Sequence, residues 1–84
     1  MDLDALENKL ARFVARETGA DPASIGSSTE LLSSGLLDSV ALVRMADLVE
    51  REVGIVIPDG DVTEENFETF GAIRSYVEKR RAEA

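Results

Sequence analysis

The sequence predicts an all-α fold, a small four-helix bundle of three main helices and one short helix, with a long first loop. Three segments have apolar residues recurring every three or four positions, which is the period of a helix. The run Ile55-Val56-Ile57 resembles a strand, but it is enclosed by Gly54 and Pro58 and has no partner run elsewhere. Since the chain has only 84 residues, we expect residues 1–84 to form a single domain.

The first helix is expected at about residues 2 to 18. Its core face consists of Leu3, Leu6, Leu10 and Phe13, which are spaced by three, four and three positions. Acidic residues at its start and Arg12 and Arg16 near its end suit the helix dipole. Gly19 is a plausible stop.

Residues 19 to 37 show no sustained period and form the long first loop. Asp21-Pro22 marks a turn. A loop of this length in so small a domain either counts against the assignment or indicates a function. Scattered apolar residues would pin the loop against the body, namely Ile25, Leu31, Leu32, Leu36 and Leu37.

The second helix is expected at about residues 39 to 53. Asp38 is a favourable N-cap, and Ser39 then occupies the first helical position. Gly54 ends the run. The core face should consist of Leu42, Ala46, Val49 and Val53, which step by four, three and four.

The remaining third of the chain predicts an extended connector and two further helices. The connector should bury Ile55 or Ile57. Asp61 or Thr63 should cap a short third helix that runs through Phe67. Thr69 should cap the last helix. In that helix Phe70, Ile73 and Val77 should face inward, with Tyr76 at the margin.

No metal site is predicted. Asp59-Gly60-Asp61 suggests a calcium loop, but such a loop needs glycine at its sixth position and glutamate at its twelfth. Those positions hold Glu64 and Phe70, so this reading is rejected.

The composition excludes several functions. The sequence contains no cysteine and no histidine, which removes thiolate nucleophiles, zinc–thiolate sites and Ser-His-Asp arrangements. A net charge of −8 disfavours binding to nucleic acid and to anionic membranes. No run approaches the ~20 apolar residues of a membrane span. We therefore expect an acidic, soluble, cytoplasmic protein without catalytic residues of its own.

The second helix has an exposed face opposite its core face. At 100° per residue this face holds Val40, Val43, Arg44, Asp47 and Arg51. Surfaces often carry scattered aliphatic residues, which is one interpretation. The other is a docking strip for a partner protein.

The stretch GLLDSV at residues 35 to 40 resembles the Gly-x-x-Asp-Ser-apolar signature of acyl carrier proteins and of aminoacyl and peptidyl carrier domains. The helix and long loop upstream, the Gly-Ile-x-Ile-Pro-Asp connector and the phrase NFETFGAIRSYV resemble the same family in the same order. The resemblance covers nearly the whole chain.

The resemblance implies a non-catalytic carrier domain in which Ser39 bears a 4′-phosphopantetheine arm. A phosphopantetheinyl transferase that uses magnesium would transfer the arm from coenzyme A, and intermediates would be held on its thiol as thioesters. Other implied partners are an acyl- or aminoacyl-loading ligase and downstream synthase enzymes, with the carrier itself a monomer. Asp38 would both cap the helix and contact the transferase or its metal.

Partner contacts are assigned to Leu37, Val40, Val43, Arg44, Asp47 and Arg51. Of Leu36 and Leu37, one should anchor the loop while the other stays near the arm. Taken alone, Ser39 could equally serve only to begin the helix. A small hydrolase using Ser39 is disfavoured because the chain has no histidine.

The exposed face departs from that of fatty-acid carriers, which is predominantly acidic, because Arg44 and Arg51 interrupt it. This difference favours a discrete carrier of a specialised pathway, such as polyketide, nonribosomal peptide or related natural-product biosynthesis. A fatty-acid carrier and an aminoacyl carrier remain alternatives within the family. A helical protein-interaction module without a prosthetic group is the alternative outside it.

Overall fold

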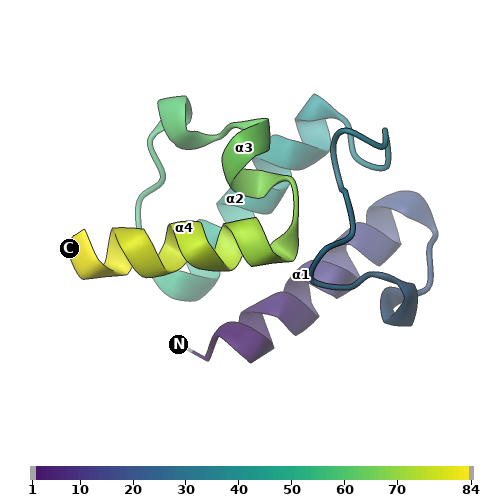
Figure 1. Ribbon diagram of the computed structural model, residues 1–84, viewed down its shortest axis with the longest axis horizontal. Coiled ribbons are helices and arrows are strands. Elements are labelled where there is room, and N and C mark those ends of the chain that lie inside the picture. Colours follow the sequence, from purple (N-terminus) through teal and green to yellow (C-terminus); the bar gives the residue numbers. More distant parts are fainter. Residues whose placement is uncertain (1, 84) are drawn as a thin grey trace.

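The computed structural model describes residues 2–83, and all regular structure within them is helical (Figure 1). The α-helices are α1 (Leu3–Thr18), α2 (Ser39–Val53), α3 (Glu64–Phe67) and α4 (Phe70–Glu83). Two single 3-10 turns, η1 (Pro22–Ser24) and η2 (Asp59–Asp61), lie in the connecting segments and were not predicted. The predicted helical bundle with a long first loop is confirmed. In this part of the chain no helix combines the length and the hydropathy needed to cross a membrane.

The predicted ends of the first two main helices are confirmed. The carboxylate of Asp2 accepts a hydrogen bond from the N–H of Asp4 at 2.9 Å and so caps α1. Gly19 and Gly54 follow α1 and α2 with φ angles of 79° and 78°. This left-handed conformation suits glycine because glycine has no Cβ.

Threonine hydroxyls start the two C-terminal helices. Of the two candidates for the α3 cap, Thr63 is the one used, since its Oγ1 accepts from the N–H of Asn66 at 3.3 Å. Thr69 accepts from the N–H of Ala72 at 3.0 Å, as predicted. The Thr69 cap lets α4 begin two residues after α3 ends.

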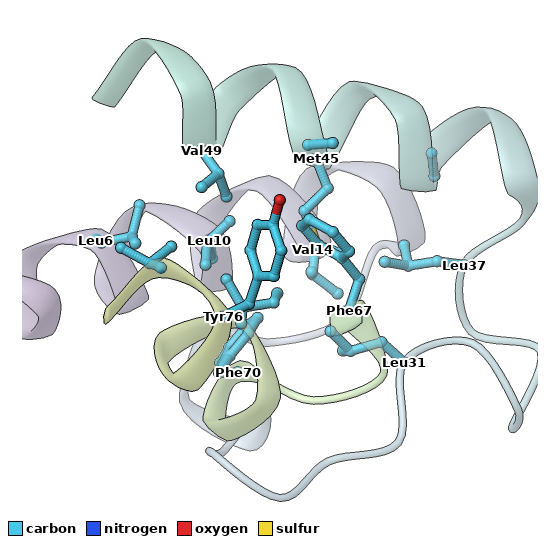
Figure 2. Packing of buried hydrophobic residues seen from close by; sticks show 14 of the residues in the cluster. Leu6, Leu10, Val14, Leu31, Leu37, Met45, Val49, Phe67, Phe70 and Tyr76 are labelled. Atoms are coloured by element: carbon cyan, nitrogen blue, oxygen red, sulfur yellow. The ribbon is translucent and has the colours of Figure 1, made fainter. Parts of the chain in front are cut away.

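A single hydrophobic cluster lies where the helices and the long loop converge (Figure 2). Its fully buried large side chains are Phe67, Phe70, Leu6, Leu10, Leu31, Met45, Ile73, Val14, Val49 and Val77. The cluster draws on α1, α2, α3, α4 and the long loop. The loop is therefore a structural part of the bundle.

The structure corrects the predicted core face of α1. Leu6 and Leu10 are buried as expected, but Val14 is completely buried and Phe13 only partly. Leu3 is also only partly buried. Steps of four align Leu6, Leu10 and Val14 along the line of contact, so Phe13 lies at its edge.

The core face of α2 is also wider than predicted. Ala46 and Val49 are buried as expected, whereas Leu42 and Val53 are only partly buried. Ala41 and Met45 are buried instead, with 7% and 0% of their surface exposed. The physical reason is that α2 packs against α1 while Ala41 and Met45 turn into the rest of the hydrophobic cluster, so a second flank of the helix is covered.

Tyr76 does not lie at the margin. Only 8% of its surface is exposed, and its ring centroid lies 5.8 Å from that of Phe67. Its hydroxyl donates a hydrogen bond to Asp61 at 2.7 Å, which links α4 to η2. Burial, together with this carboxylate, raises the pKa of Tyr76 to about 12.

The long loop is held by buried leucines and by one carboxylate. Leu31 donates its N–H to the backbone oxygen of Glu68 at 2.8 Å. The Glu68 carboxylate accepts from the N–H groups of Leu32 and Ser33 at 2.9 and 3.1 Å, and from the Ser33 hydroxyl. The hydroxyl of Ser33, together with the two N–H groups, holds the pKa of Glu68 below its ordinary value.

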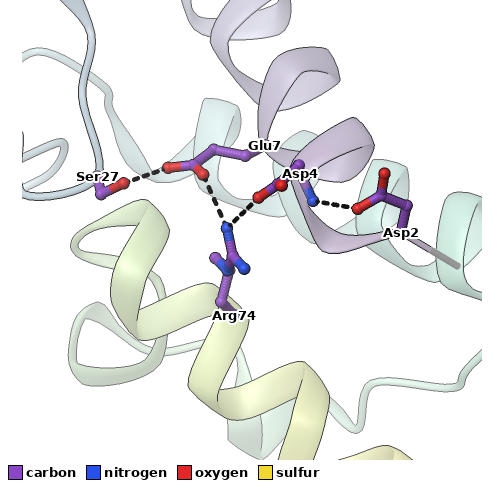
Figure 3. Close-up of polar contacts among 5 residues, drawn as sticks. All are labelled: Asp2, Asp4, Glu7, Ser27 and Arg74. Atoms are coloured by element: carbon purple, nitrogen blue, oxygen red, sulfur yellow. Dashed lines mark hydrogen bonds and ion pairs between the residues drawn. The ribbon is translucent and has the colours of Figure 1, made fainter.

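An ion-pair cluster joins the start of α1 to α4 (Figure 3). The Arg74 guanidinium lies 2.8 Å from the Asp4 carboxylate and 3.1 Å from that of Glu7. Glu7 also accepts from the hydroxyl of Ser27 at 2.6 Å, so the long loop joins the same cluster. The two carboxylates raise the pKa of Arg74 and keep it charged.

The connector after α2 returns along that helix. Ile57 is the residue it buries, with 6% exposed, which confirms one of the two predicted alternatives. The N–H of Ile57 donates to the Glu50 carboxylate at 2.7 Å. The connector is thereby held against the helix that it follows.

Candidate functional site

The junction between the long loop and α2 is formed by Asp38 and Ser39. Asp38 has extended backbone angles, and its Oδ1 accepts a hydrogen bond from the N–H of Ala41 at 2.8 Å. This geometry confirms the predicted N-cap. Ser39 is the first residue of α2, as the sequence indicated.

The Ser39 side chain is exposed and has no structural task in the described chain. Its hydroxyl forms no hydrogen bond to any of residues 2–83, because Asp38 already supplies the cap. A serine used only to start a helix would place its own oxygen on an N–H of the first turn. The hydroxyl is therefore free to react with an external reagent.

An apolar hollow of about 330 Å³ opens directly beside Ser39. Its lining comes from α2 and from the returning connector and η2. The lining residues are Ser39, Leu42, Val43, Ala46, Asp47, Glu50, Ile57, Asp59 and Val62. A flexible group attached to Ser39 would find apolar walls within reach.

A second hollow, of about 280 Å³, borders the same junction on the side of the long loop. It is lined by Glu17, Leu36, Leu37, Asp38, Val40, Ala41 and Arg44. Leu36 and Leu37 in this lining belong to the long loop, so the loop borders the junction on one side. The junction therefore stands between two concave surfaces.

Leu37 does not fit the partner-contacting role that the sequence suggested. Only 4% of its surface is exposed, and it belongs to the hydrophobic core. The N–H of Leu37 donates to the backbone oxygen of Leu31 at 2.8 Å, and both side chains lie in the core (Figure 2). Leu37 is thus the loop anchor, and Leu36 is the partly buried neighbour beside the junction.

The face of α2 next to Ser39 is exposed as predicted. Val40 and Val43 expose 58% and 61% of their surface, and among residues 2–83 only Val56 is a more exposed large hydrophobic residue. Arg44, Asp47 and Arg51 are exposed on the same face. We call these five residues the α2 strip.

The local chemistry does not suit catalysis. The chain has no histidine or cysteine, and residues 2–83 hold no group of three acidic side chains that could bind a metal ion. The carboxylate of Glu50 in the first hollow is occupied by the N–H of Ile57. The junction therefore offers an exposed hydroxyl to which no base among residues 2–83 is hydrogen-bonded.

The same features fit a phosphate-linked group. The junction lies at a helix N-terminus, where exposed N–H groups and the helix dipole favour an anion by roughly 0.3–1 kcal/mol. No side chain of the described residues competes for the hydroxyl. An apolar hollow lies next to it.

The walls of the first hollow that come from outside α2 were not predicted. Ile57, Asp59 and Val62 reach Ser39 only because the connector folds back along the helix. A usable signal was the short distance between Gly54 and the next cap at Thr63, which keeps the connector close to α2.

Comparison of the chain with known proteins identifies its family. The family model described as a phosphopantetheine attachment site matches residues 8–77. Acyl carrier proteins from Rickettsia typhi and Rickettsia prowazekii are each 28% identical over 79 residues, covering 94% of this chain and 90% of theirs. That of Thermotoga maritima is 29% identical over 73 residues, covering 87% and 88%. The chain therefore belongs to the family of phosphopantetheine-bearing carrier proteins, whose members are non-catalytic carriers modified by a phosphopantetheinyl transferase.

Proposed function

We propose that Ser39 is the attachment residue and that the chain carries biosynthetic intermediates as thioesters between the enzymes of a specialised pathway. The observation that carries this proposal is the exposed Ser39 hydroxyl, which has no hydrogen bond within residues 2–83 and stands between two hollows. The arm supplies a thiol, which forms the thioester bond to the cargo.

The chain's own residues act by presenting the hydroxyl. Asp38 fixes the start of α2, so Ser39 leaves the helix end in a defined direction. The transferase has to supply the base, because no basic partner contacts the hydroxyl. Asp38 remains exposed on its outer side, where it can contact the transferase or the magnesium ion that the transferase holds.

The α2 strip is the proposed docking face for the transferase, the loading ligase and the synthase enzymes. Val40 and Val43 lie within one turn of Ser39 and offer apolar contact. Arg44, Asp47 and Arg51 lie further along and would set orientation and on-rate. Both signs of charge occur on the strip, so a matched partner needs both signs as well.

This mixed charge supports a specialised pathway with its own partner enzymes. A surface that only has to meet basic patches would be weakened by Arg44 and Arg51. The hollow beside Ser39, about 330 Å³, is at the lower end of the range for ligand sites, which favours a small cargo.

Mass spectrometry of the intact protein tests the attachment. The chain is incubated with coenzyme A, magnesium and a broad-specificity transferase, and should gain the mass of one phosphopantetheine group. The Ser39→Ala variant should gain nothing, whereas Ser75→Ala, which removes an exposed serine from α4, should load fully. Loading of Ser39→Ala, or no loading of the unmodified sequence, would refute Ser39 as the attachment residue.

The pathway is tested by isolating the protein from its native host and weighing the group on the arm. A short polyketide, aminoacyl or related intermediate is expected. A series of saturated fatty acyl chains of increasing length would instead identify a fatty-acid carrier.

A further inference from the structure

The cations of this acidic chain lie on three helices, α1, α2 and α4. Of the nine Lys and Arg residues, five lie on α1 and α2. These five are Lys9, Arg12, Arg16, Arg44 and Arg51. The α1 members are spaced by three and four positions, so they share one face of that helix.

A hollow of about 540 Å³ lies between α1 and α2 along this face. Lys9, Arg12 and Arg16 form its rim together with Glu52. Its apolar walls come from Ala15, Pro22 and Leu48. We call this hollow with its cations the basic groove.

Most of the positive charge in the basic groove is not neutralised within the described residues. Lys9 pairs with Glu52 at 2.6 Å. Arg12 and Arg16 form no ion pair or hydrogen bond with residues 2–83. Arg74 contrasts with them, because two carboxylates of α1 hold it in the cluster of Figure 3.

The basic groove adjoins the α2 strip. Arg44 reaches across to Glu17 of α1 at 3.2 Å, which places it on the flank of α2 that faces α1. Arg51 follows Leu48, a wall residue of the groove, by three positions on α2, and it likewise has no partner among residues 2–83. A partner lying in the groove would therefore also touch the proposed docking face.

We propose that the basic groove binds an acidic amphipathic helix of a protein partner. Apolar residues of such a helix, three and four positions apart, would enter between α1 and α2, as helix ridges enter grooves. Its flanking carboxylates would meet Arg12 and Arg16, which no residue of the described chain neutralises. The net charge of −8 would repel an acidic helix from the rest of the surface, which makes the groove selective. The same net charge, together with the concave shape, disfavours an anionic membrane as the occupant.

This inference goes beyond the carrier role and does not depend on Ser39. The probe is a synthetic helical peptide with leucines on one face and glutamates on both flanks, titrated into the ¹⁵N-labelled full chain. Amide signals of Ala15, Leu48 and their neighbours should shift, and the affinity should fall as salt rises.

Two charge reversals provide a matched pair. Arg12→Glu should weaken peptide binding by about tenfold or more, because it places a like charge in the groove. Lys79→Glu makes the same change in net charge on α4 and should leave the affinity within about twofold. Circular dichroism of both variants checks that the fold is retained.

Three outcomes would overturn the inference. The first is that no amide signals of the groove shift at up to about 1 mM peptide. The second is that Arg12→Glu and Lys79→Glu weaken peptide binding equally. The third is that the chain binds vesicles of anionic phospholipid in an Arg12-dependent way but does not bind the peptide. Ser39→Ala should bind the peptide normally. A failure of the attachment proposal and a failure of this one can therefore be distinguished.

Discussion

Two regions of this small bundle differ in whether their side chains are bonded within the fold or left exposed to solvent. On the side where α1, α4 and the long loop meet, Arg74 bridges two carboxylates and Glu68 accepts from three donors of the loop. At the start of α2, the Ser39 hydroxyl has no bond within the described residues, while Val40 and Val43 face solvent. The first region uses its groups to hold the fold, and the second leaves them available to other proteins.

The largest expected difference between the two regions concerns one leucine of the loop and one valine of the strip. Leu31→Ala should lower the free energy of unfolding by about 2–5 kcal/mol, because Leu31 is fully buried. Val43→Ala should change it by less than about 0.5 kcal/mol, because 61% of Val43 is exposed. Urea denaturation followed by circular dichroism measures both. Similar values for the two variants would contradict the division of roles.

A smaller effect is expected at the junction itself. Asp38→Ala should cost about 1 kcal/mol, because it removes the cap on the N–H of Ala41. Ser39→Ala should cost less than about 0.5 kcal/mol, since its hydroxyl makes no bond in the described chain. The same denaturation experiment ranks the two. A larger loss for Ser39→Ala would mean that the serine has a structural role.

The hydroxyl of Tyr76 forms a hydrogen bond within the fold, unlike that of Ser39. Tyr76→Phe should cost about 0.5–1.5 kcal/mol through loss of the bond to Asp61. As the pKa of Tyr76 is raised to about 12, its contribution is complete below pH 10 and is lost as the pH rises towards 12. The chain has one tyrosine, so ultraviolet absorption reports this titration directly. A midpoint near that of free tyrosine would contradict the buried hydrogen bond.

The smallest effect is a local one at Glu68. Because its folded pKa lies below the ordinary 4.5, its contribution is present above that value and is lost as the pH falls through the folded pKa. Amide exchange at Leu32 and Ser33 should therefore accelerate in acid, relative to amides within α2. Glu68→Gln should accelerate exchange at the same amides at neutral pH. The Glu65→Gln variant, which alters an exposed neighbour in α3, serves as the control.

Much of the fold followed from local patterns. The caps at Asp38 and Thr69 and the glycines after α1 and α2 were predicted because each depends on backbone groups within a few residues. The exposed α2 strip was predicted for the same reason, as helical geometry alone separates its residues from the core. These features can be predicted without knowing which helices pack against one another.

The errors occurred where a residue's role depends on distant contacts. Leu37 was assigned to partner contact, with the loop anchor left open between it and Leu36, but the turn closed by its bond to Leu31 buries it. The burial of Met45 and Val14 was not predicted. The spacing of apolar residues identifies one face of a helix, but it does not say how much of the helix surface the neighbouring helices cover. Tyr76 was placed at the margin because its partner, Asp61, lies in another element.

The periodicity and residue types of the sequence are sufficient to predict the helices, the caps at Asp38 and Thr69, and the serine at the start of α2, and the sequence contains no histidine or cysteine. Only the tertiary structure decided that Ser39 stands between two hollows and that α1 and α2 together form a basic groove. The physical reason is the distance along the chain over which each interaction acts. Hydrogen bonds and periodicity act over one or two turns of chain, whereas a concave surface requires segments far apart in sequence to meet.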